Sequence, residues 1–101
     1  MTRSDYLTRI RANVAHNVRH YRYQLGLSQS GLAERIGMTE NRIYILEKPG
    51  KGGVPLDVLA AIAHELGIKV ADLVAFREAV PAKHGQAGAR FLNHQRELHR
   101  A

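Results

Sequence analysis

The stretch SQSGLAERIGMTENRIYILE, residues 28–47, decides the fold of this 101-residue chain. Ser28 can cap a helix that ends at Gly37, and Thr39 can cap the next helix. Glycine at the turn permits a left-handed backbone, and the small side chain of Ala33 allows two helices to pack closely. The stretch therefore predicts two short helices joined by a tight turn.

Apolar residues at helical spacing continue on the N-terminal side of this stretch. Residues 4–25 predict one long helix, which Ser4 or Asp5 can cap and which Gly26 ends. Its apolar stripe consists of Leu7, Ile10, Val14, Val18, Tyr21 and Leu25.

Two further segments follow on the C-terminal side. Pro55 suits the first position of a helix that Gly67 ends. The stripe of that helix consists of Leu56, Leu59, Ile62, Ala63 and Leu66. The segment Val70–Phe76 fits either a short helix or a strand, and the positions of Leu73 and Val74 favour the helix.

The remaining segments contain helix-breaking residues. Residues 49–54 predict a flexible connection, and residues 81–88 predict a linker. Residues 89–100 could form a weak helix. We therefore expect an all-α bundle of about five helices over residues 4–76, followed by a flexible or weakly helical basic tail over residues 77–101.

Composition excludes several classes of protein. The chain has no cysteine, so disulfide scaffolds, thiolate zinc sites and thiol catalysis are excluded, and a cytoplasmic location is expected. The longest apolar run, Val58–Ala63, is far shorter than the ~20 residues of a membrane span. The net charge of +6 favours nucleic acid or another polyanion as partner.

The charge is not spread evenly along the chain. Residues 1–25 carry five arginines and one aspartate, a net charge of +4. Residues 26–76 have five basic and six acidic side chains, a net charge of −1, and residues 77–101 have five basic and two acidic ones, a net charge of +3. This distribution indicates an ordered core with basic flanks.

The two helices and their surroundings resemble the lambda-repressor/Cro family of helix-turn-helix DNA-binding domains. The resemblance covers about residues 14–76 and rests on the run Val18 to Gln29 and on Leu32, Ala33, Gly37, Ile43, Leu46, Glu47, Leu59, Ala63, Leu66, Gly67 and Leu73. It implies a compact five-helix bundle that binds double-stranded DNA as a homodimer, without a cofactor, and regulates transcription, most often as a repressor.

The resemblance also implies which residues read DNA. The helix Thr39–Lys48 would enter the major groove, with Ile43 and Leu46 turned into the core. The expected base-reading residues are Thr39, Glu40, Asn41, Arg42, Tyr44 and Ile45. Residues expected to hold phosphates are Gln29, Lys48 and Lys51. An arginine and a glutamate at the family's paired positions, Arg22 and Glu47, imply a structural ion pair.

Three features depart from the family pattern. Gly31 lies where a good helix former is usual and should cost ~1 kcal/mol relative to alanine. Pro49 replaces the usual glycine, and the loop to Pro55 is longer than usual. Glu40 and Ile45 replace common polar readers, so the preferred DNA sequence is not predicted.

Other functions have less support in the sequence. His16 and His20 are spaced to share a metal ion, but no third ligand is apparent, and we expect no metal site. No nucleophile has an adjacent base, so an enzyme is not expected. The alternative is an antitoxin or another partner-binding protein, in which residues 77–101 or Val70–Phe76 bind and neutralise a protein partner while the helix-turn-helix regulates its own gene.

Overall fold

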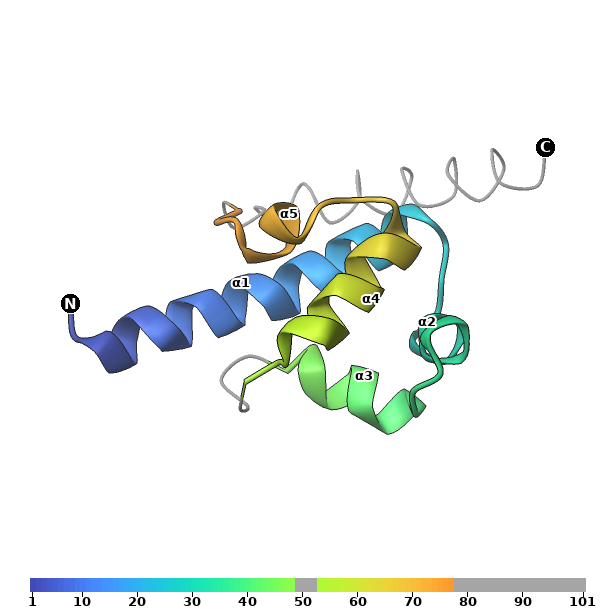
Figure 1. Ribbon diagram of the computed structural model, residues 1–101, viewed down its shortest axis with the longest axis horizontal. Coiled ribbons are helices and arrows are strands. Elements are labelled where there is room, and N and C mark those ends of the chain that lie inside the picture. Colours follow the sequence, from blue (N-terminus) through green and yellow to red (C-terminus); the bar gives the residue numbers. More distant parts are fainter. Residues whose placement is uncertain (49–52, 78–101) are drawn as a thin grey trace, which may run out of the picture.

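The computed structural model describes residues 1–48 and 53–77. These residues form five α-helices: Arg3–Gln24 (α1), Gln29–Ile36 (α2), Glu40–Leu46 (α3), Leu56–Leu66 (α4) and Val70–Val74 (α5) (Figure 1). The all-α fold class is confirmed, and the ambiguous segment after Lys69 is a helix. The predictions for residues 49–52 and for the tail after Arg77 lie outside the described residues.

The caps predicted for α2 and α3 and the end of α2 at Gly37 are confirmed, whereas the helix predicted as Thr39–Lys48 ends at Leu46. The Ser28 hydroxyl caps α2 by accepting the Gly31 N–H at 2.9 Å, and the Thr39 hydroxyl caps α3 by accepting the Arg42 N–H at 3.2 Å. Gly37 ends α2 at φ +70°, a conformation that glycine adopts without the steric cost of a Cβ. The stop at Gly37 and the two side-chain caps therefore fix how α2 and α3 meet.

The predicted start of α1 was wrong. The helix begins at Arg3, and its N-cap is Thr2 rather than Ser4 or Asp5. The Thr2 hydroxyl accepts the Asp5 N–H at 3.0 Å, and the Asp5 carboxylate accepts the Thr2 N–H at 3.2 Å, which forms a capping box. This backbone hydrogen bond from Thr2 also lowers the pKa of Asp5.

Two residues of the predicted apolar stripes, one near the start of α1 and one at the start of α4, are exposed. Leu7 is 44% exposed and Leu56 is 73% exposed, although both were expected to face the core. Leu7 precedes the first buried residue of α1, Val14, and Leu56 is the first residue of α4, so helical spacing alone does not bury them. Pro55 is the N-cap of α4 rather than its first helical residue.

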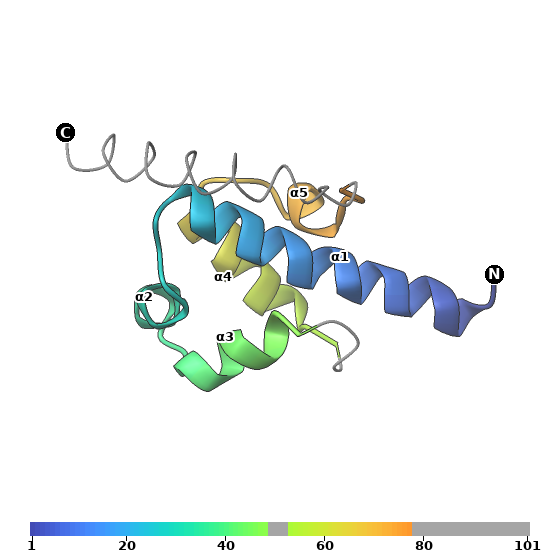
Figure 2. The same ribbon diagram turned by 180° about the vertical axis from the view of Figure 1, so that it is seen from behind.

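The core lies where all five helices converge. Its buried members are Val14, Val18, Leu32, Ala33, Ile43, Ile62, Ala63, Leu66 and Leu73. In both views α1 separates α5 from α3, and α2 lies toward one end of the bundle (Figures 1 and 2). This arrangement turns the side of α3 opposite Ile43 outward.

Polar side chains of α1 hold the C-terminal end of α5. The Asn13 amide donates to the Val74 carbonyl at 3.1 Å. The Asn17 amide is 1% exposed and donates to the carbonyls of Leu73 at 2.9 Å and Ala75 at 2.7 Å. Because a five-residue helix has little stability of its own, these bonds fix its position.

Candidate nucleic-acid interface

The exposed side of α3 carries all of the predicted base-reading residues. Thr39, Glu40, Asn41 and Arg42 are exposed, Tyr44 is 45% exposed and Ile45 is 44% exposed. In the same segment, Ile43 is fully buried, and Leu46, which follows Ile45, is half-buried against the core. The helix therefore has one side in the core and the opposite side free for a ligand.

The exposed side of α3 has two distinct flanks. On one flank the Lys48 ammonium lies 4.3 Å from the centre of the Tyr44 ring, a cation–π contact. On the other flank Arg42 and Ile45 border a shallow hollow of about 270 Å³, whose other walls include Met38 and residues of the segment 53–58. Asn41, by helical spacing, lies between the two flanks.

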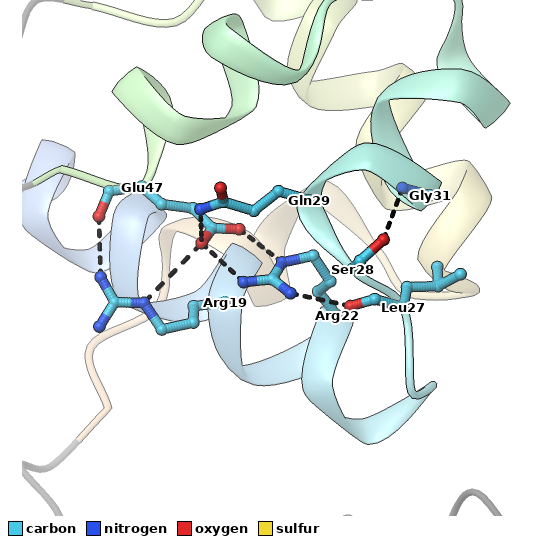
Figure 3. Close-up of polar contacts among 7 residues, drawn as sticks. All are labelled: Arg19, Arg22, Leu27, Ser28, Gln29, Gly31 and Glu47. Carbon is cyan, nitrogen blue, oxygen red and sulfur yellow. Dashed lines mark hydrogen bonds and ion pairs between the residues drawn. The ribbon is translucent and has the colours of Figure 1, made fainter.

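Arg22 and Glu47 form a buried two-pronged ion pair (Figure 3). The Arg22 Nε donates to Glu47 Oε2 at 2.8 Å, and the second guanidinium nitrogen donates to Oε1 at 2.9 Å. Arg22 is 5% exposed and Glu47 is 2% exposed. The pair joins α1 to the C-terminal end of α3 and so positions α3.

Burial and pairing have opposite effects on the Arg22 guanidinium. Burial by itself would lower the pKa of Arg22, but the hydrogen bonds and the attraction of the Glu47 carboxylate outweigh it and raise the pKa. A third donor nitrogen bonds the Leu27 carbonyl at 2.8 Å, in the segment before α2. Arg22 therefore stays charged and links α1, α3 and the start of the helix-turn-helix.

Gln29 takes part in the same network. Its side-chain Nε2 donates to Glu47 Oε1 at 3.1 Å, from the first turn of α2 (Figure 3). The sequence analysis predicted that Gln29 contacts a DNA phosphate. The structure shows, in addition, a hydrogen bond from Gln29 to the Arg22–Glu47 ion pair, which the sequence did not indicate. An amide nitrogen has two hydrogens, so one remains for a phosphate.

Arg19 is a positioning residue that the sequence analysis did not single out. Its guanidinium donates to the Glu47 backbone carbonyl at 3.0 Å, and its Nε lies 3.8 Å from the Glu47 carboxylate. The positive side chain therefore satisfies a carbonyl at the C-terminal end of α3. The sequence could have indicated this role, because the three-residue spacing of Arg19 and Arg22 places the two side chains next to each other on one helix.

Of the predicted phosphate residues, Lys48 directly precedes the gap in the described chain and Lys51 falls within it. Lys48 is exposed directly after α3. Lys51 lies outside the described residues. The binding of a phosphate by Lys48 and Lys51 in the loop after α3 therefore stays a prediction.

Residues 1–48 and 53–77 show neither a metal cluster nor a membrane-spanning helix. In these ranges, no group of three or more histidine, cysteine or acidic side chains is placed to hold a metal ion. Among the helices described, none combines the length and the apolar character that a membrane crossing requires.

Comparison with known proteins agrees with the geometry. A search of solved structures finds the crystal structure of the hypothetical transcription factor NHTF from Neisseria, at 24% sequence identity and a TM-score of 0.61, over 77% of this chain and 83% of that chain. At this identity the likeness supports the helical fold. A search of curated proteins finds no match.

The fold and the exposed side of α3 define a helix-turn-helix DNA-binding protein. Residues 17–78 match the family of Cro/C1-type HTH DNA-binding domains, and the chain belongs to that family. The resemblance to lambda-repressor and Cro proteins is thereby confirmed, and the chain carries a Cro/C1-type DNA-binding domain.

Proposed function

We propose that the protein is a repressor that binds a two-fold symmetric operator through α3, as a homodimer, in the cytoplasm. The observation that carries this proposal is the division of α3 into a buried side and a side on which the six reading residues of the sequence analysis are exposed. A helix with such an exposed side fits the major groove, where each base pair shows a distinct pattern of donors and acceptors.

The exposed residues offer complementary chemistry to base edges. The Asn41 amide can pair bidentately with adenine, and the Arg42 guanidinium with guanine or a phosphate. Glu40 can accept from the cytosine amino group, and the Thr39 methyl or Ile45 can contact the methyl group of thymine. Tyr44, whose ring lies under the Lys48 ammonium, can add an aromatic contact at the edge of the same surface.

Phosphate contacts would set the position of α3 on the duplex. Gln29 lies in the first turn of α2, where its free N–H and the backbone N–H groups can meet one phosphate. Lys48 and Lys51 would hold a second phosphate on the far side of α3. Such contacts supply affinity that falls with salt, whereas the contacts of α3 supply sequence preference.

Footprinting on the DNA upstream of the protein's own gene tests this proposal. We expect protection of a two-fold site with half-sites ~10 base pairs apart, centre to centre. Asn41→Ala and Arg42→Ala should each lose ~1–3 kcal/mol of preference for one base pair. Lys69→Ala removes one positive charge outside the interface and serves as the control for Arg42→Ala.

Two outcomes would contradict the proposal. One is binding without preference over random DNA. The other is an unchanged footprint when Gln29, Asn41 and Arg42 are all replaced by alanine. Recruitment of a stoichiometric protein partner through residues 77–101, detected by pull-down from the native host, would instead support the antitoxin alternative.

A further inference from the structure

The hollow beside α3 has mostly apolar walls and lies open to solvent on one side. Its volume is about 270 Å³, and the segment 53–55 runs past it from the end of α3 to the start of α4 (Figures 1 and 2). Its apolar walls include Met38, Ile45, Val54, Pro55 and Val58. Because an enclosed apolar cavity of ~150 Å³ is large enough for benzene, this hollow has room for an apolar body of about six carbons.

Two features that the DNA-reading role leaves unexplained meet at this hollow. Ile45 stands where a polar reader is common, and its side chain is 44% exposed. The loop to Pro55 is longer than usual, and its last residues form another part of the wall. An exposed apolar side chain beside a recess gains from being covered by an apolar ligand. The hollow is therefore a recess built into the reading surface rather than apart from it.

Arg42 gives the hollow a single positive charge. Among the described residues that line it, Arg42 alone is charged. The side chain is exposed, and within residues 1–48 and 53–77 no carboxylate lies at ion-pair distance from it. A guanidinium offers two parallel N–H donors to a carboxylate. Apolar walls with one cation match a molecule that has an apolar body and one anionic end.

We propose that this hollow binds a small amphipathic carboxylate. The apolar chain or ring, of about six carbons, lies against Ile45, Val54 and Val58, and the carboxylate pairs with the Arg42 guanidinium. An ammonium compound of the same shape is repelled by Arg42 and is excluded from the site. The chemical class is therefore a free monocarboxylic acid with a short hydrocarbon chain.

Occupation of the hollow would prevent α3 from reading DNA. Arg42 and Ile45 are two of the residues that the proposed function assigns to base edges, and the bound carboxylate engages both. A molecule that binds the free protein and not the DNA complex moves the protein off its operator by mass action. This regulatory step rests on the proposed function, whereas binding of the carboxylate does not.

Titration of the full chain with hexanoate, followed by NMR of the methyl groups, tests the site in the absence of DNA. We expect saturable shifts of the methyl signals lining the hollow, with little change at Val70 in α5. Butanoate should bind about tenfold more weakly, because each buried methylene contributes roughly three- to fourfold in affinity. Hexylammonium, with the same chain and the opposite charge, should bind more weakly by about fivefold or more.

Four single variants at exposed positions, measured without DNA, localise the site. Arg42→Gln should weaken hexanoate binding by about three- to fivefold, the strength of an exposed ion pair. Lys48→Gln is its matched control, because it removes the same charge from the other flank of α3, where Lys48 lies over the Tyr44 ring. Ile45→Ala should weaken binding by about fivefold. Tyr44→Ala is the control for Ile45→Ala, since the two side chains are 45% and 44% exposed.

Three results would overturn the site. They are shifts that do not saturate, equal binding of hexanoate and hexylammonium, and equal effects of Arg42→Gln and Lys48→Gln.

Footprinting in the presence of hexanoate then separates the site from the function. We expect protection of the operator to fall as hexanoate fills the hollow. An intact footprint with no binding of hexanoate would overturn the site alone, and binding of hexanoate by a chain that protects no operator would overturn the proposed function alone. A footprint that persists when the hollow is saturated would overturn the regulatory step.

Discussion

At the scale of the residue, the carboxylate of Glu47 controls the geometry of the interface. It binds Arg22 of α1 and Gln29 of α2 at the end of α3. We predict that Arg22→Ala costs ~3–5 kcal/mol of unfolding free energy, because it leaves a buried carboxylate without its partner. Urea unfolding measures this loss, and the loss of DNA affinity should be no larger.

The control for this prediction removes both charges. A double variant, Arg22→Met with Glu47→Leu, should recover part of the lost stability, because no unpaired charge then remains in the core. An unaltered melting curve for Arg22→Ala would show that the pair does not hold α1 to α3.

Gly31 illustrates how a local contact changes an expectation based on propensity. The sequence suggested that glycine inside α2 costs ~1 kcal/mol relative to alanine. A Cβ at this position would lie 3.2 Å from the Ser28 hydroxyl oxygen, which caps the helix. We predict that Gly31→Ala stabilises the native chain by less than this ~1 kcal/mol, because the new methyl group crowds the Ser28 hydroxyl. When Ser28 is replaced by glycine, the same substitution should give a larger gain in stability, closer to ~1 kcal/mol.

Thermal melting of the four proteins in this cycle measures the coupling between positions 28 and 31. An equal gain from Gly31→Ala in both backgrounds would mean that the hydroxyl moves aside freely. In that case helix propensity alone would account for the stability gained by Gly31→Ala.

At the scale of the element, α5 depends on the side chains of α1. Asn17 uses both amide hydrogens on the carbonyls of Leu73 and Ala75. We predict that Asn17→Asp destabilises the protein by at least ~1–3 kcal/mol, because a carboxylate would replace the two donors in a buried position. Asn13→Ala removes a single, less buried bond and should cost less.

Hydrogen exchange of the backbone amides in α5 localises the effect. Exchange there should accelerate more than in α2, which does not depend on Asn17. Wild-type stability of Asn17→Asp would contradict the role assigned to this side chain.

The elements differ in how well the sequence predicted them. Ser28, Gly37 and Thr39 act through their own backbone neighbours, so the ends of α2 and α3 could be read directly. The bonds from Asn17 to α5 and from Arg19 to Glu47 join distant segments, and such polar contacts leave no periodic signal. Leu7 was misjudged because helical spacing shows which side of a helix is apolar and not where its packing partner ends.

At the scale of the whole molecule, the net charge of +6 is a weaker indication of function than it first appears. The segment 26–76, which contains α2 and α3, has a net charge of −1. In the proposed function, sequence preference would therefore come from placed side chains of α3 such as Asn41, while the flanks, residues 1–25 and 77–101, would supply attraction that depends on salt.

This division of roles predicts the effect of removing residues 78–101. These residues carry Lys83, Arg90, Arg96 and Arg100 together with Glu78 and Glu97. Each phosphate contact contributes about −0.9 to the slope of log affinity against log salt, so the truncated chain should show a less steep slope with the same preferred site. Lys48→Ala should likewise reduce the slope by about 1 without moving the footprint. A change of preferred site on truncation would mean that the tail reads bases, and the reading surface would then extend beyond α3.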